Sequence, residues 1–281
     1  MSVLTSYNPI IHKEAKETEL LCSIILDQVS AQAVFLLGSS KSYRKTTTIF
    51  SYDIPTASFT SHYYILVLVE KEEEHTLNAA QDKIENNLQH FVPTTAIVLS
   101  TTAFMAWLSK GHPFAVNVLE KAERLYQNEI LLLPPPSTIN EEEQKESNER
   151  LFKQTKLKIE GFLASAELHK LRGDNKLSAF MLHQSAEQAL RAMLIINTGL
   201  KLNTHSIDKL LRYCSIFCNQ LQDVFPKNNE KEKKLYALLN KAYIDTRYKD
   251  DYTITHEELS CLTEKLKRIK ERFEHYKPKM A

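Results

Sequence analysis

The chain has 281 residues, of which 43% are hydrophobic, 9% aromatic and 25% charged. These values are typical of a globular protein and exclude a disordered or collagen-like chain. Only 5 residues are glycine and 9 are proline, which argues against a turn-rich β-sandwich and favours helices. At about 100–200 residues per domain, the length permits one large domain or two ordinary ones.

The net charge of +1 conceals two halves of opposite sign. Residues 1–150 carry 12 basic and 19 acidic side chains, a net charge of −7, whereas residues 151–281 carry 24 and 16, a net charge of +8. This asymmetry predicts either two halves that dock on each other or a basic surface that binds phosphates. Two solvated surfaces of opposite sign are the alternative.

The cysteine pattern and the N-terminus bear on metals and location. Cysteines stand at positions 22, 214, 218 and 261 without a Cys-x-x-Cys pair, so we expect small core residues and no metal site. The first residues do not follow the pattern of a signal peptide, and no apolar run reaches about 18 residues. We therefore expect a cytoplasmic protein with no membrane contact, and we expect no cofactor.

The clearest division of the chain follows three consecutive prolines, Pro134–Pro136. A charged stretch containing serine and asparagine comes next, and the net charge changes sign at the same place. Proline ends helices. We therefore predict an N-terminal domain over residues 1–133, an extended or helical linker over 134–149, and a C-terminal domain over 150–281.

Helices and apolar runs alternate in the first half. The predicted elements, in chain order, are a helix over 17–32, a strand over 33–40 that ends at Gly38, a strand over 62–70, a helix over 76–91, a strand over 94–100 and helical structure over 101–126. Continuous apolar strands between helices indicate a sheet with helices on at least one face. We predict an α+β domain.

The second half shows helical periodicity throughout. Apolar spacing predicts helices over 148–172, 174–198, 206–224, 230–247 and 256–276. Asp174 is expected to cap the second helix, and Thr255 with Glu258 forms a capping box for the last. Five helices with short connections predict an all-α antiparallel bundle.

Residues 17–126 resemble the minimal nucleotidyltransferase fold of the DNA polymerase β superfamily in the order of their elements. In that family a Gly-Ser pair after the first strand holds phosphate, so Gly38 and Ser39 are expected as a phosphate-binding remnant, with a simple turn as the alternative. The family's two metal-binding aspartates are missing from Ser61–Tyr64. Because Mg²⁺ needs oxygen ligands held together, the resemblance implies a catalytically inactive domain.

Three motifs of the second half occur in a common order. They are His-Gln-x-Ala-Glu at His183–Glu187, Thr-His-Ser around His205, and Arg-Tyr-x-Asp-x-Tyr at Arg247–Tyr252. Together they resemble the HEPN (higher eukaryotes and prokaryotes nucleotide-binding) domain, in particular its sacsin-like branch, over about residues 150–276. The resemblance implies a nucleotide or RNA as partner and a homodimer formed through the helical bundle.

The spacing of polar residues points to the same region. His183, Glu187 and Arg191 are four residues apart and share one helix face; the alternative is an ordinary exposed ion-pair ladder. An arginine can bind phosphate bidentately while a tyrosine ring stacks on a base. A helix-ending salt bridge and a loop contact are the alternative roles of Arg247 and Tyr248. The predicted nucleotide-binding residues are His183, Glu187, Arg191, His205, Arg247, Tyr248 and Asp250.

Three functions fit the sequence. The leading hypothesis is a nucleotide- or RNA-binding regulatory protein with no catalytic residue. The second is a HEPN ribonuclease restrained by its fused N-terminal domain, as in a toxin–antitoxin pair. Family ribonucleases use an Arg-x(4–6)-His motif in which the histidine transfers a proton; no histidine follows Arg247 at that spacing, and one formal match is Arg268 with His275. The third is a non-catalytic scaffold.

Overall fold

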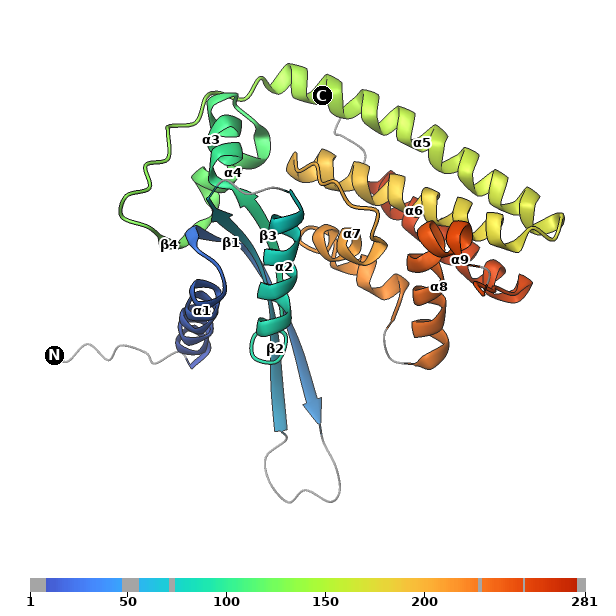
Figure 1. Ribbon diagram of the computed structural model, residues 1–281, viewed down its shortest axis with the longest axis horizontal. Coiled ribbons are helices and arrows are strands. Elements are labelled where there is room, and N and C mark those ends of the chain that lie inside the picture. The colour runs from blue at the N-terminus through green and yellow to red at the C-terminus, as the bar shows by residue number, and fades with distance from the viewer. Residues whose placement is uncertain (1–8, 47–55, 71–73, 227–228, 250, 277–281) are drawn as a thin grey trace. The chain divides into compact units, whose positions relative to one another are not determined.

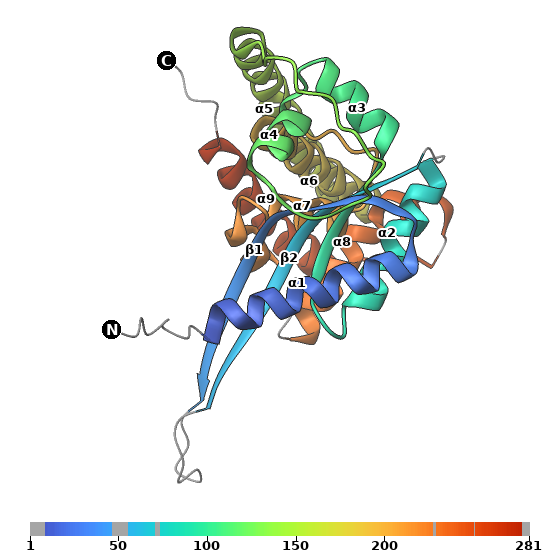
Figure 2. The same cartoon turned by 90° about the vertical axis from the view of Figure 1, so that its left-hand side faces the viewer.

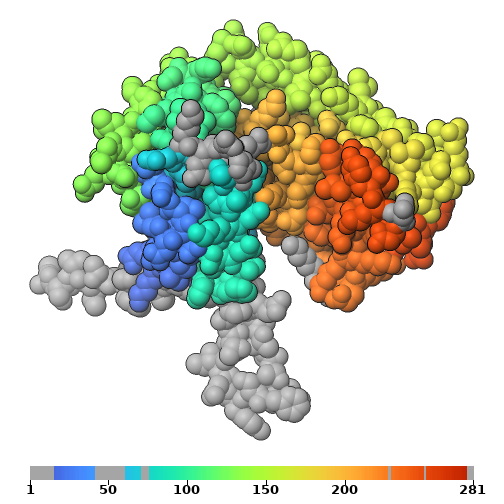
Figure 3. Space-filling view, in the orientation of Figure 1, coloured from blue at the N-terminus to red at the C-terminus, as the bar shows by residue number. Residues whose placement is uncertain are grey.

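A computed structural model describes residues 9–46, 56–70, 74–226, 229–249 and 251–276. The chain divides into two compact units, residues 1–138 and 139–281 (Figure 1, Figure 2 and Figure 3). Each unit is described by itself below.

A small mixed sheet forms the centre of the N-terminal unit. Its strands lie in the order β3-β2-β1-β4. Strand β2 pairs with β1 antiparallel and with β3 parallel, and β4 pairs with β1 antiparallel. The bounds are β1 Ala31–Thr46, β2 Thr56–Val69, β3 Thr94–Ser100 and β4 Glu123–Gln127.

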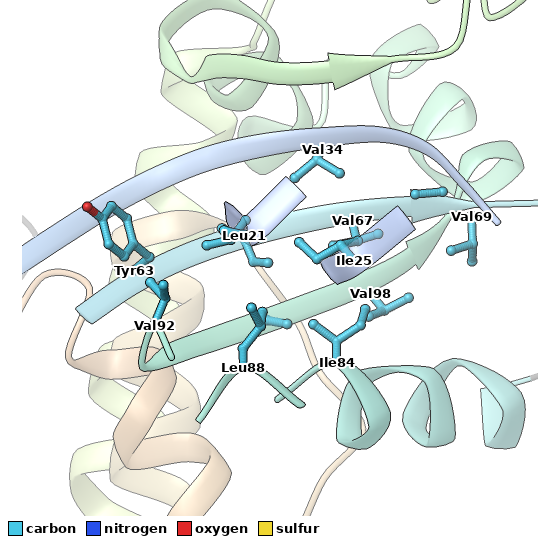
Figure 4. Close-up of a cluster of buried hydrophobic side chains, with 13 residues drawn as sticks. Leu21, Ile25, Val34, Tyr63, Val67, Val69, Ile84, Leu88, Val92 and Val98 are labelled. Atoms are coloured by element: carbon cyan, nitrogen blue, oxygen red, sulfur yellow. The ribbon is translucent and has the colours of Figure 1, made fainter. Parts of the chain in front are cut away.

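Four helices accompany the sheet: α1 Pro9–Gln28, α2 Glu74–Leu88, α3 Thr101–Ser109 and α4 Pro113–Lys121. Leu21 of α1 and Leu88 of α2 pack on one face of the sheet, in a cluster that includes Val67 (Figure 4). Figure 2 shows α1 running across this face. On the other face, the ring of Phe35 lies 6.1 Å from that of Phe104 in α3. Both faces are buried, which explains the continuous apolar strands.

Strand β1 does not end at Gly38, contrary to the sequence prediction. It continues to Thr46, and Gly38 and Ser39 lie opposite Tyr64 and Tyr63 of β2. The residues after Gly38 therefore continue the antiparallel pair with β2, and the alternative of a simple turn at Gly38 is wrong. The register shifts just before Gly38, where glycine accommodates an irregular backbone.

The stretch 101–126 is not continuously helical as predicted. Gly111 ends α3 with a φ of +64°, in the left-handed region that favours glycine. Pro113 then begins α4 at its first turn, where its missing N–H costs nothing. The last residues form β4, because Tyr126 and its neighbours pair with β1.

The C-terminal unit is helical. Helix α6 packs against α5, α7, α8 and α9, so it is buried on most sides and its residues Leu182, Ala186 and Met193 are almost completely inaccessible. The bounds are α5 Glu141–Leu171, α6 Asn175–Thr198, α7 Ile207–Cys214, a 3₁₀ helix Asn219–Val224, α8 Glu230–Tyr248 and α9 His256–His275.

The local predictions for this unit have mixed outcomes. Thr255 and Glu258 form the expected capping box. Asp174 stands at the N-terminal cap of α6 but makes no capping hydrogen bond with its side chain. Helix α5 begins at Glu141, so part of the segment assigned to a linker is helical. Among the described residues, no helix has both the length and the apolar character needed to cross a membrane.

The single helix predicted over 206–224 is wrong, because α7 ends at Cys214 and a 3₁₀ helix follows. The hydroxyl of Ser215 donates to the Leu211 carbonyl, and the amide of Ile216 donates to Tyr213 only three residues back. Serine, aromatic and β-branched residues favour helices weakly. The run from Tyr213 to Asn219 consists largely of such residues, so the chain tightens there.

Phe273→Ala should destabilise the C-terminal unit. Its ring is completely buried and stacks on Phe152 at 4.7 Å, joining α9 to α5. We expect a loss of about 3–5 kcal/mol in the free energy of unfolding, measured by urea unfolding followed by far-ultraviolet circular dichroism. Ile244→Ala, at a 57% exposed position, should change it by less than about 0.5 kcal/mol. Equal effects of the two changes would contradict this packing.

Candidate functional site

A buried carboxylate, that of Glu187 in α6, lies at the centre of a polar cluster. Glu187 is only 2% exposed. Its oxygens lie 3.2 Å from Nε of Arg191 and 3.1 Å from Nδ1 of His205. Burial favours the neutral acid, but the neighbouring His183, His205 and Arg191 outweigh it and lower the pKa of Glu187 below its usual range. The carboxylate is therefore ionised at neutral pH.

His183 ties α6 to α8 beneath this carboxylate. Its side chain is completely buried, and its Nδ1 lies 2.9 Å from the carbonyl oxygen of Leu239. A carbonyl only accepts, so Nδ1 carries the proton and donates. Nε2 lies 3.6 Å from Glu187, beyond hydrogen-bond distance, and this buried atom has no hydrogen-bond partner among the described residues.

Arg191 connects the same helix to the segment before α7. Its Nε lies 3.2 Å from the carbonyl oxygen of Thr204, in addition to the contact with Glu187. The alternative of an ordinary exposed ion-pair ladder is wrong, because Glu187 and His183 are both buried. A buried carboxylate without these partners would be strongly destabilising. We call His183, Glu187, Arg191 and His205 the Glu187 cluster.

An aromatic row extends from the Glu187 cluster towards the surface. The ring of His205 stacks on that of Tyr243 of α8, with 4.2 Å between the ring centres and 10° between the ring planes. Tyr243 in turn stacks on Phe180 of α6, with 6.3 Å between the ring centres and 25° between the planes. The Tyr243 hydroxyl also lies 3.4 Å from Nε2 of His205. Phe180 was missed in the sequence analysis, although it stands three residues before His183 and on the same helix face.

Arg247 completes the row at the surface. Its guanidinium carbon lies 4.3 Å from the ring centre of Tyr243 and 4.7 Å from that of Phe180. Such cation–π contacts contribute about 0.5–1 kcal/mol at exposed sites. Arg247 is exposed and forms no ion pair with another described residue, so the alternative role of a helix-ending salt bridge is not found in the described part of the chain.

The remaining predicted site residues lie apart from this arrangement. Tyr248 is 77% exposed and makes no ring contact with another described residue. Asp250 lies outside the described residues. Gly38 and Ser39 belong to the N-terminal unit and lie inside β1. The binding roles of these four residues remain predictions.

The positions where the nucleotidyltransferase family carries aspartates have other partners here. His62 of β2 lies with its Nε2 2.9 Å from the Thr95 hydroxyl of β3. The Tyr63 hydroxyl donates to Glu17 of α1 at 2.8 Å, and burial together with this carboxylate raises the pKa of Tyr63 to about 12. Across the ranges that the structure describes, no group of three or more His, Cys, Asp or Glu side chains is placed to hold a metal ion.

The formal ribonuclease match lies on α9. Arg268 donates to the Asp223 carbonyl at 3.3 Å, and the His275 ring meets Tyr276 edge-on at 5.6 Å. Both side chains are exposed, and no contact between them is found in the described chain. In the Glu187 cluster, by contrast, the carboxylate contacts both the arginine and a histidine directly.

The family comparison places the Glu187 cluster and the aromatic row in a known kind of domain. Residues 157–276 match the family model of the HEPN domain. A HEPN domain, which is related to nucleotides or RNA and is often a ribonuclease, therefore occupies most of the helical unit. No family match confirms the nucleotidyltransferase resemblance of the N-terminal unit. No curated protein matches the chain.

Glu187→Gln should destabilise the HEPN domain in a pH-dependent way. Because folding lowers the pKa of Glu187, its carboxylate stabilises the fold above the unfolded-state pKa of about 4.3, and this stabilisation disappears as pH falls through the folded-state value. Charged hydrogen bonds suggest a loss of about 2–3 kcal/mol at neutral pH. The difference between variant and wild type should shrink below about pH 4.

Urea unfolding at several pH values, followed by circular dichroism, measures this difference. Glu230→Gln is the control, because the Glu230 side chain is 88% exposed. The single tryptophan, Trp107, lies in α3, so its fluorescence follows the N-terminal unit separately. A pH-independent difference would show that the carboxylate charge is not what stabilises the cluster.

Proposed function

We propose that the HEPN domain binds a nucleotide or RNA and that the protein is regulatory rather than catalytic. The observation that carries this proposal is the position of Arg247. Its exposed guanidinium is held over Tyr243 and Phe180 and has no acidic partner among the described residues. A positioned arginine with unused donors is suited to bind phosphate oxygens in pairs.

The neighbouring side chains supply the other contacts that such a ligand needs. The exposed ring of Tyr248 offers a face for base stacking, worth about 1–3 kcal/mol per base. His205 has a side chain that is 46% exposed, so its ring is placed to make a further contact with the ligand. Asp250 is proposed as a further ligand contact from the sequence motif alone.

The buried members of the Glu187 cluster are proposed to position this surface. Glu187 fixes the orientation of His205, while Arg191 holds the backbone before α7 and His183 holds α8. Their contribution to binding is therefore indirect. We also propose that two copies of the chain associate through the helical unit.

The N-terminal unit is proposed as an inactive nucleotidyltransferase-like domain. His62 and Thr95 bond to each other, and Tyr63 bonds to Glu17. Histidine and a neutral phenol supply none of the anionic oxygens that Mg²⁺ prefers, which supports a non-catalytic role. The phosphate contact predicted at Gly38 and Ser39 remains part of this proposal, and its test is phosphate binding by the intact chain.

Arg247→Ala should weaken binding of short single-stranded RNA and of ATP or GTP by about 10-fold or more, the equivalent of one charged hydrogen bond. Fluorescence anisotropy of labelled RNA and titration calorimetry of the nucleotides, at one fixed salt concentration, measure the change. Arg150→Ala is the matched control, because Arg150 is 64% exposed and pairs only with Glu146 among the described residues. Absence of binding by wild type, or equal binding by Arg247→Ala, would remove the proposal.

One observation favours ribonuclease activity as the second candidate. Glu187 holds Nδ1 of His205, so Nε2 is left to exchange a proton with a ribose hydroxyl, while Arg247 could stabilise the phosphorane charge. The Tyr243 hydroxyl beside Nε2 argues for a binding role instead. In this alternative the N-terminal unit would restrain a toxin-like nuclease.

We expect purified wild-type protein to leave structured RNA intact, as a binding protein would. Gel analysis of RNA after incubation checks this expectation. Cleavage that disappears in His205→Ala would favour the Glu187 cluster as a nuclease centre. Cleavage that disappears in both Arg268→Ala and His275→Ala would favour the motif on α9 instead. A scaffold without ligands would show neither cleavage nor binding.

A further inference from the structure

Two cations of α8 lack an acidic partner among the described residues. Lys241 and Arg247 are exposed and form no ion pair there. One turn after Lys241, the carboxylate of Asp245 is only 9% exposed and pairs with Lys249 at 3.0 Å. The uncompensated positive charge of α8 therefore lies in its C-terminal half. The lysines that pair with glutamate or aspartate, in this helix or at its end, are Lys231, Lys233, Lys234 and Lys249.

The two unpaired cations lie at the ends of one row of side chains. Ile244 is three residues from Lys241 and three from Arg247, so the three side chains follow one another obliquely around the helix. Because Cβ atoms three residues apart on a helix are about 5–6 Å from each other, the two cationic side chains start about 10–12 Å apart. Ile244 between them is 57% exposed.

An exposed aromatic ring lies beside this row. Tyr248 is 77% exposed and comes four residues after Ile244, on the same side of α8. The tyrosine and the isoleucine together form a small exposed apolar patch, with one unpaired cation on either side of it. We call Lys241, Ile244, Arg247 and Tyr248 the α8 surface.

The two cations match the placement of phosphates in RNA. Within an RNA strand, each nucleoside carries one phosphate on its 5′ oxygen and another on its 3′ oxygen. ATP and GTP, by contrast, carry all their phosphates on the 5′ oxygen. An apolar patch with a cation on either side therefore suits a nucleotide inside a strand, because the base stacks on the aromatic ring while both flanking phosphates meet a positive charge.

We propose that a single strand of RNA crosses the α8 surface, with one phosphate at Arg247, the attached nucleoside over Tyr248 and Ile244, and the next phosphate at Lys241. This inference rests on the proposed function and specifies its ligand. Because Arg247 is the proposed contact for the 5′ phosphates of ATP or GTP, Lys241 takes the 3′ phosphate. A base stacks on Tyr248 only when it is not stacked within a duplex, so the strand is single.

The two cations contribute in different ways. Arg247 is held over the rings of Tyr243 and Phe180, so it loses little conformational freedom when it binds phosphate. Lys241 makes no ring contact or hydrogen bond with another described residue and acts as a flexible point charge. Lys241 therefore adds affinity and salt dependence but no preference for a base.

Lys241→Ala should weaken binding of short single-stranded RNA by about 3–5-fold, the upper range for one exposed charge pair. The slope of log K against log salt should fall by about 0.7, the value for one phosphate contact on a single strand. Fluorescence anisotropy over a salt series measures both. Lys231→Ala is the matched control, because Lys231 lies on the same helix, is 66% exposed and pairs with Glu257. Circular dichroism should show both variants folded.

Two small ligands separate the phosphate positions. ADP and adenosine 3′,5′-bisphosphate each contain two phosphates, but only the bisphosphate has one on each side of the nucleoside. Titration calorimetry with wild type and variants should show that Lys241→Ala weakens binding of the bisphosphate by about 3–5-fold and leaves ADP binding unchanged. Arg247→Ala should weaken binding of both ligands.

The outcomes distinguish this inference from the proposed function. Absence of RNA and nucleotide binding by wild type would remove both. RNA binding that falls in Arg247→Ala but is equally strong in Lys241→Ala and Lys231→Ala would leave the proposed function in place and overturn the path across α8. Equal losses for ADP and the bisphosphate in Lys241→Ala would put both cations at the 5′ phosphates, and binding of the nucleotides without RNA would exclude a strand. Either result would also overturn the path.

Discussion

The ionised carboxylate of Glu187 is the constraint on which the helical unit depends. A carboxylate that is 2% exposed is stable only with charged or hydrogen-bonding partners. Arg191 and His205 supply them, so α6 and the segment before α7 must meet at this point. His183 extends the constraint to α8 through Leu239. One buried charge thereby fixes three parts of the HEPN domain relative to one another.

This arrangement separates two roles that the sequence motif combines. His183, Glu187 and Arg191 bond to one another or to the backbone, whereas the outer Arg247 rests on aromatic rings and has donors to spare. Stability and the proposed binding role thus reside in neighbouring but different side chains. A mutation of the inner residues changes the fold first, and a mutation of Arg247 changes the surface alone.

Periodicity was sufficient to predict most helices, because α6 and α9 carry regular apolar spacing and α9 begins with a capping box. It was insufficient where a distant strand decides the structure. The polar residues after Gly38 stay in β1 because β2 pairs with them, and β4 forms because β1 lies beside it. Spacing also brought His183, Glu187 and Arg191 to one face, but the burial of Glu187 and the role of Phe180 depend on how α8 packs.

The proposed ligand surface depends on the packing of α6 against α8. Phe180 of α6 and Tyr243 of α8 stack on each other and lie under the Arg247 guanidinium. The buried His183 of α6 contacts the Leu239 carbonyl of the same helix α8. A buried contact between the two helices therefore fixes the place of the exposed guanidinium, which explains why a surface arginine can be positioned without an ion pair among the described residues.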